Sequence, residues 1–114
     1  MFDFQGLEVY KKAKLFHLDC KKIIVEKKLD KFVIDQHGRA SFSVPLNIAE
    51  GSGKFSRAHR KYFFTIARAS LFECVAVIDI LEDEGNMYEF ECKKIMKDAD
   101  ELSRFLFEMI KNLS

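Results

Sequence analysis

The stretch SVPLNIAEG, residues Ser43–Gly51, decides the fold of this chain. It holds the only proline of the sequence, and that proline lies among apolar residues whose spacing is helical. One face, at alternating steps of four and three residues, is formed by Val33, His37, Ala40, Val44 and Asn47. Because residues at these steps share one side of a helix, the pattern predicts a helix over about 31–51 that passes through Pro45.

Pro45 should bend this helix. It lacks an N–H and pushes against the carbonyl of Ser41, so we expect a kink there. The alternative is a helix that starts at Pro45. We favour the kink because the apolar spacing continues through the proline, and because Gly51 and Gly53 provide a better stop.

Three further segments have helical spacing, and they predict helices over about 7–28, 56–84 and 87–113. In that order, their apolar stripes are Val9, Ala13, Phe16, Cys20 and Ile23; Phe63, Ala67, Ser70, Cys74, Val77 and Leu81; and Ile95, Ala99, Leu102, Leu106, Met109 and Leu113. A second stripe beside that of 56–84 contains Tyr62, Ile66, Ala69, Glu73, Ala76 and Ile80. An apolar surface this wide indicates a helix that is covered on more than one side.

Residues that favour helix ends lie between these segments. Asp30 and Ser56 are candidate N-caps, and Gly85-Asn86 is a candidate C-cap. Residues Gly51–Phe55 form the one clear loop in the middle of the chain. Four long helices joined by short turns predict an all-α fold, an antiparallel up-down-up-down four-helix bundle. At 114 residues, 1–114 should form a single domain.

The composition points to a cytoplasmic globular protein. The formal net charge is +1, so the charge of the whole chain predicts no polyanionic partner. The three cysteines, Cys20, Cys74 and Cys92, lie far apart and outside any CxxC pattern, so we expect reduced core thiols. The N-terminal residues do not resemble a signal peptide, and no apolar run approaches the roughly 18–20 residues of a membrane span.

Residues Gln36–Glu73 carry a family-like pattern. Its first part comprises Gln36, Arg39, Ala40, Ser43, Val44, Pro45, Asn47, Ile48, Ala49, Glu50 and Gly51. Its second part comprises Ala67, Ala69, Ser70, Leu71 and Glu73. These residues, together with the opening GLEVYK at 6–11, resemble the family of helical-bundle proteins encoded in intervening sequences of bacterial 23S rRNA genes. Leu46 and Ala69 depart from the family pattern, which has a small polar residue and a glycine there.

This resemblance implies a four-helix bundle that assembles as a ring-like homopentamer, and it implies no settled activity. The family is similar to the accessory variability determinant of diversity-generating retroelements, a pentameric bundle that binds nucleic acid beside a reverse transcriptase. Nucleic-acid binding is therefore an expectation by analogy.

A run without acidic residues between Glu50 and Glu73 is the best functional lead. Its cations are Lys54, Arg57, Arg60, Lys61 and Arg68. With Phe55 and Tyr62 among them, they could hold phosphates and stack a base. The alternative is a solvated face paired with acids of a neighbouring helix or subunit, such as the Glu82–Glu84 cluster.

Polar residues on the apolar stripes suggest a structural cluster of Arg39, Asn47, Glu50 and Glu73. Asn47 could donate to the carbonyl of Ser41 that Pro45 frees. Glu50 or Glu73 could pair with Arg39 or Arg68.

No constellation typical of catalysis occurs. The three histidines are well separated, Glu-x-x-His pairs of di-metal bundles are missing, and GSGK at 51–54 lacks the spacing and the strand of a phosphate-binding loop. We expect no enzyme, no metal and no cofactor. The sequence favours an oligomeric bundle that binds RNA or DNA, and the alternative is a structural or protein-interaction scaffold without a nucleic-acid role.

Overall fold

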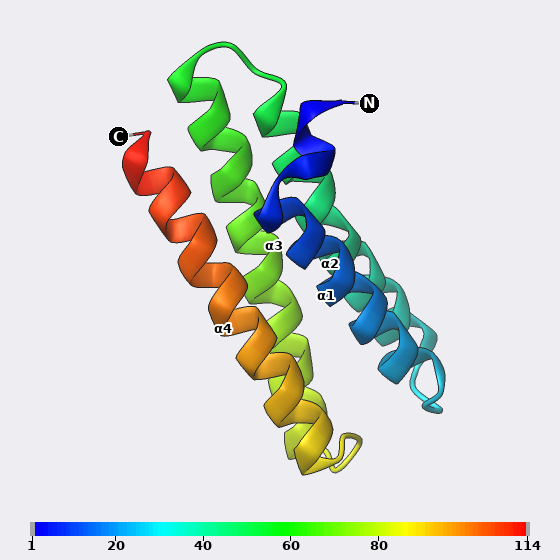
Figure 1. Ribbon diagram of the computed structural model, residues 1–114. Helices are drawn as coiled ribbons and strands as arrows, with labels where there is room; N and C mark the ends of the chain where they lie inside the picture. Colours follow the sequence, from blue (N-terminus) through cyan, green and yellow to red (C-terminus); the bar gives the residue numbers. More distant parts are fainter. Residues whose placement is uncertain (1, 114) are drawn as a thin grey trace.

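Four long helices account for nearly all of the protein. The computed structural model describes residues 2–113, with a short 3-10 helix, η1 (Asp3–Gly6), before α1 (Glu8–Val25), α2 (Lys31–Ser52), α3 (Arg57–Asp83) and α4 (Glu89–Asn112). Consecutive helices run in opposite directions, and the described residues contain no strand (Figure 1). This confirms the predicted all-α four-helix bundle. None of these helices combines the length and apolar character that crossing a bilayer demands.

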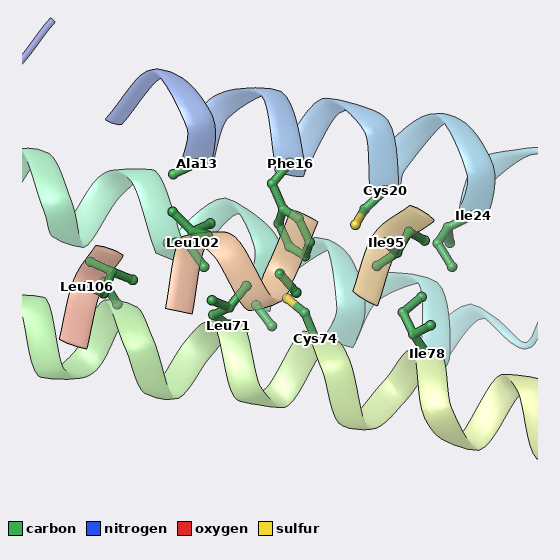
Figure 2. Close-up of a cluster of buried hydrophobic side chains, with 14 of the residues drawn as sticks. Ala13, Phe16, Cys20, Ile24, Leu71, Cys74, Ile78, Ile95, Leu102 and Leu106 are labelled. Atoms are coloured by element: carbon green, nitrogen blue, oxygen red, sulfur yellow. The ribbon is translucent and has the colours of Figure 1, made fainter. Parts of the chain in front are cut away.

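The core is formed by one stripe from each helix. Figure 2 shows the stripes of α1, α3 and α4 facing one another. The stripes predicted for α1 and α4 are confirmed over most of their length. The buried residues are Val9, Ala13, Phe16, Cys20 and Ile24 in α1 and Cys92, Ile95, Ala99, Leu102 and Leu106 in α4. Burial of these apolar surfaces is the main stabilising contribution to the fold.

The buried stripe of α3 differs from the predicted one. It comprises Phe64, Ala67, Leu71, Cys74, Ile78 and Leu81. Phe63 and Val77 are half-buried, and the second predicted stripe faces solvent, with Tyr62 60% and Ile80 55% exposed. The expectation that α3 is covered on more than one side is therefore wrong within this chain. The sequence of α3 has three adjacent apolar stripes, so its pattern does not determine which one is buried.

Helix α2 passes through Pro45, which is buried, rather than starting there. It continues to Ser52 with Gly53 as C-cap, which confirms the predicted stop at the glycine pair Gly51 and Gly53. Gly51 serves packing: a Cβ there would lie 2.8 Å from Cε1 of Phe64 and 3.0 Å from Cβ of Phe63. The missing side chain allows α3 to approach α2 closely. The kink at Pro45 stays a prediction.

Helix ends follow the predicted signals on α3. Ser56 accepts a hydrogen bond from the backbone N–H of His59 at 3.0 Å, which confirms the N-cap. Gly85 has φ of 77°, and Asn86 donates its backbone N–H to the carbonyl of Leu81 at 2.8 Å, which confirms the Gly-Asn end. Asp30 is the residue before α2, although its side chain makes no capping hydrogen bond.

Two other boundaries differ from the prediction. Helix α1 ends at Val25 rather than 28, because Lys27 lies beyond the helix and pairs with Glu91 of α4. Helix α4 begins at Glu89 rather than 87, since Met87 is buried under the turn and Tyr88 is the N-cap. In both cases a tertiary contact determines where the helix stops or starts.

Candidate nucleic-acid interface

Four of the five predicted cations lie at one end of the bundle. Lys54 is in the turn between α2 and α3, and Arg57, Arg60 and Lys61 lie in the first turns of α3 at spacings of three and four residues. This turn lies at the same end as η1 and the last turn of α4 (Figure 1). We call these four residues the basic end.

The cations of the basic end contact backbone carbonyls and an aromatic ring. Arg60 donates from Nε to the carbonyl of Lys54 at 2.7 Å, and Arg57 donates from Nη2 to the carbonyl of Asn112 at 2.6 Å. Nζ of Lys54 lies 5.1 Å from the ring centre of Phe63. Lys61 is exposed. Within residues 2–113, none of the four forms an ion pair.

The acidic cluster Glu82–Glu84 lies too far away to pair with them. It follows the other end of α3, a helix of 27 residues that spans about 40 Å. Pairing of these cations with acids of a neighbouring helix does not occur within residues 2–113, and pairing with acids of a neighbouring subunit stays the alternative.

The position of these cations is electrostatically unfavourable. A helix N-terminus carries a partial positive charge and favours acidic residues in the first turn. The first turn of α3 contains no acid, and its flanking charges are cationic. The backbone N–H groups of a first helical turn have no partner within the helix, and they favour binding of an anion from another molecule. Local stability thus gives no reason for this charge pattern, whereas an anionic partner does.

Two aromatic side chains accompany the basic end. Phe55 precedes the N-cap and is 101% exposed, as free of contacts as a side chain in a short peptide. Tyr62 is 60% exposed and meets Phe63 edge to face, with ring centres 5.2 Å apart. Exposed rings among cations are a suitable arrangement for stacking on bases.

Arg68, the fifth predicted cation, lies apart from the other four. It is eleven residues beyond Arg57, about 16 Å along α3. Its Nε donates to the carbonyl of Ser103 in α4 at 3.3 Å, and its guanidinium lies 4.7 Å from the ring centre of Phe72 and 5.5 Å from that of Phe107. Arg68 therefore belongs to an α3–α4 surface and not to the basic end.

A hollow of about 580 Å³ at the same end was not predicted from the sequence. Its lining includes Phe4, Leu7, Arg60, Phe64 and Met109. These residues come from η1, the start of α3 and the end of α4, so no local pattern in the sequence could reveal it. Asp3 is the one acid in its lining.

The predicted polar cluster of Arg39, Asn47, Glu50 and Glu73 is not assembled. Asn47 donates from Nδ2 to the carbonyl and the hydroxyl of Ser43, at 2.9 and 2.8 Å, rather than to Ser41. Asn47 lies four residues beyond Ser43, on the same face of the helix, whereas Ser41 is six residues away and lies on another face. This explains why Asn47 bonds to Ser43 and not to Ser41.

Arg39, Glu50 and Glu73 are all exposed. Arg39 and Glu73 line one shallow hollow, but no ion pair within residues 2–113 joins Arg39 or Arg68 to Glu50 or Glu73. The hydroxyls of Ser43 and Ser70, 2.9 Å apart, provide the polar link between α2 and α3 instead.

The three cysteines are free and buried, as predicted. Burial raises the pKa of Cys74 to about 12 and that of Cys92 to about 11, and it raises the pKa of Cys20 as well. Thiols in this state stay protonated at neutral pH and are poor nucleophiles. Among residues 2–113, His, Cys, Asp and Glu do not gather in any group of three or more suited to a metal ion.

Comparisons with known proteins agree with this fold. The family model described as 23S rRNA-intervening sequence protein matches residues 5–108. A solved structure of a protein with unknown function from the S23 ribosomal protein family of Bacteroides thetaiotaomicron VPI-5482 is similar, with a TM-score of 0.83 and 23% identity. The match covers 90% of this chain and 98% of that one. No curated protein matches the chain.

Proposed function

The chain belongs to the 23S rRNA-intervening sequence protein family, and on this premise we propose that it is a non-enzymatic, oligomeric bundle that binds RNA or DNA through the basic end. The observation that carries this proposal is the set of four cations at the N-terminus of α3, none of which forms an ion pair within residues 2–113. Phosphates are the partners that such a surface would attract.

Three further features support binding of nucleic acid. Phe55 and Tyr62 offer rings for base stacking beside the cations. The free N–H groups of the first turn of α3 add a second source of positive potential. The family that the sequence resembles is in turn similar to the accessory variability determinant of diversity-generating retroelements, a bundle that binds nucleic acid, which supports the proposal by analogy.

Oligomerisation is proposed from exposed apolar side chains. Phe72 and Ile80 are exposed apolar side chains on α3, and Phe107 is an exposed one on α4. Exposed apolar surface of this kind is typical of subunit interfaces. By family resemblance we expect a homopentamer in the cytoplasm, and three free, buried cysteines suit a reducing compartment. Arg68, stacked on Phe72 and Phe107, would then lie at the subunit boundary.

The second candidate is a structural or protein-interaction scaffold without a nucleic-acid role. The same exposed apolar side chains support it, because an oligomer or a protein complex needs no basic end. The two candidates differ in what they expect of the cations, and charge reversal therefore separates them.

The test measures the affinity for a short fluorescent RNA, and for DNA of the same sequence, by anisotropy at several salt concentrations. Lys54→Glu with Lys61→Glu should weaken binding by at least about tenfold and lower the slope of log K against log salt by about two. The control is Lys28→Glu with Lys31→Glu, which changes the net charge equally at exposed positions, Lys28 in the turn between α1 and α2 and Lys31 at the start of α2.

The control should bind as the wild-type protein does. Equal binding by both double variants would show that the basic end is not the interface. If the wild-type protein does not bind at low salt, nucleic-acid binding is excluded and the second candidate, the scaffold, is favoured. Light-scattering mass with and without RNA measures the subunit count in the same samples.

A further inference from the structure

A hollow between α1 and α2 has the chemistry of a small-ligand site. Its volume is about 390 Å³, within the range that ligand pockets usually have. It lies between the second half of α1 and the first half of α2, and none of its lining residues belongs to the basic end.

The floor of this hollow is open because residue 38 is glycine. A Cβ at Gly38 would meet no atom within 4 Å, and the φ angle of Gly38 is not positive. Glycine weakens a helix interior relative to alanine. No turn, close approach or backbone conformation therefore requires glycine here, and its visible consequence is space above α2.

The walls of the hollow are apolar and its charges have one sign. Ile24, Ile34 and Phe42 supply the apolar surface, and Lys21 and Arg39 supply the charges. No acid lines the hollow, and within residues 2–113 neither cation forms an ion pair. Burial, followed by the charge of Lys21, lowers the pKa of His17, another lining residue. An apolar body with one negative charge would complement this surface.

His37 adds an unsatisfied polar group. Its side chain lines the hollow although the residue is only 1% exposed. Its Nε2 is the one buried side-chain nitrogen or oxygen within residues 2–113 that has no hydrogen-bond partner. Native proteins rarely leave such an atom unpaired, and where they do, the atom often marks a functional position.

We propose that the hollow between α1 and α2 binds a small organic carboxylate with an aromatic or branched apolar body. The carboxylate lies between Lys21 and Arg39, and the apolar body lies over Gly38 against Ile24, Ile34 and Phe42. His37 lines the site beside these residues. This site is independent of the basic end, so either proposal can fail alone.

The probes are benzoate and 4-methylpentanoate, followed on the full chain by amide chemical shifts and by calorimetry. Acetate, which lacks the apolar body, and benzyl alcohol, which lacks the charge, are the comparison compounds. Both acids should shift the amides of residues 17–25 and 34–42 and bind at least about tenfold more tightly than acetate or benzyl alcohol.

Variants test the two halves of the site. Gly38→Leu fills the open floor and should abolish binding, while thermal unfolding verifies that the bundle is intact. Lys21→Gln should weaken binding by about tenfold, which is the effect of losing one charged hydrogen-bond partner. Lys22→Gln is the matched control, because Lys22 is exposed and does not line the hollow.

Four results would each overturn the proposal: no shift of these amides at millimolar acid, benzyl alcohol as tight as benzoate, unchanged binding by Gly38→Leu, or equal binding by the Lys21 and Lys22 variants. Should Gly38→Leu fail to fold, the lysine pair and the comparison compounds still decide the question.

Discussion

The two ends of the bundle treat charge in opposite ways. At the end formed by the α1–α2 and α3–α4 turns, Nζ of Lys27 lies 2.7 Å from Oε1 of Glu91, and each side chain is only 15% exposed. The same Nζ lies 5.0 Å from the ring centre of Tyr88. We call this the closed end. At the basic end, the cations meet carbonyls and a ring, and none of them forms an ion pair among the described residues.

This difference separates charge that stabilises the fold from charge that is available to a partner. Half-buried ion pairs join parts of the chain, and removal of one member leaves the other uncompensated. Exposed cations without acids contribute little to folding. Substitutions at the closed end should therefore change stability, and substitutions at the basic end should change binding.

The largest expected effect is on the pH dependence of stability, through His37, which lies in the half of α2 nearer the closed end. Burial, followed by the charge of His17, lowers the pKa of His37 to about 4, against 6.5 when unfolded. Folding thus favours the neutral imidazole. The contribution of neutral His37 to the free energy of unfolding is therefore complete above pH 6.5. It is lost as the pH falls through about 4, and the free energy of unfolding decreases by roughly 3 kcal/mol.

Urea unfolding at several pH values measures this loss, and His37→Gln should remove it. The exposed His59 provides the control, since His59→Gln should retain the wild-type dependence. A His37→Gln protein with unchanged pH dependence would show that acid destabilises the fold elsewhere.

The next effect tests the closed end itself. Glu91→Ala should lower the free energy of unfolding by about 2–3 kcal/mol, because it leaves half-buried Lys27 unpaired and also removes the acceptor for the backbone N–H of Tyr88. Glu89→Ala is the matched control. Glu89 is exposed in its pair with Lys93, so its loss should cost no more than about 0.5 kcal/mol.

At the basic end the equivalent change is Lys61→Ala, which should stay within about 0.5 kcal/mol of wild type. Chemical denaturation measures all three variants. The contrast between the ends would fail if Lys61→Ala destabilised the protein as much as Glu91→Ala.

A third effect concerns the packing that positions the basic end. Gly51→Ala should destabilise the protein by about 2 kcal/mol, because its Cβ would overlap Phe64 and press on Phe63 at the α2–α3 contact. Gly38→Ala should instead stabilise it by about 0.5–1 kcal/mol, since the added Cβ meets nothing. Thermal unfolding measures the stability of both variants relative to wild type. Gly51→Ala should lower the melting temperature and Gly38→Ala should raise it, and changes of the same sign would contradict this prediction.

The helices were predictable from the sequence because burial repeats at helical steps. Val9, Phe16 and Cys20 in α1, and Ile95 and Leu102 in α4, lie in the core where the spacing places them. The local end signals at Ser56 and Gly85 were readable for the same reason, since each acts through the backbone of its own helix.

The remainder required tertiary information. The sequence could not show which of the three apolar stripes of α3 is buried. It also could not show that α1 ends before Lys27, whose partner Glu91 lies 64 positions away in the sequence. The role of Gly51 depends on how closely Phe64 approaches. The basic run was visible as composition, but only the structure separates Arg68 from the other cations.

The smallest stability effect bears most directly on the contrast between the ends. Ser56 already caps α3 by accepting from the N–H of His59, so His59→Glu would complete a capping box and place an acid in the first turn. It should stabilise the protein by about 0.5–1 kcal/mol. It should also weaken RNA binding several-fold, because it adds a negative charge among the cations. The same residue would thus improve folding and impair binding, as expected of a surface whose charges serve a partner. A paired measurement of unfolding and anisotropy on this variant checks both signs, and a gain in both properties would show that the basic end does not contact phosphate.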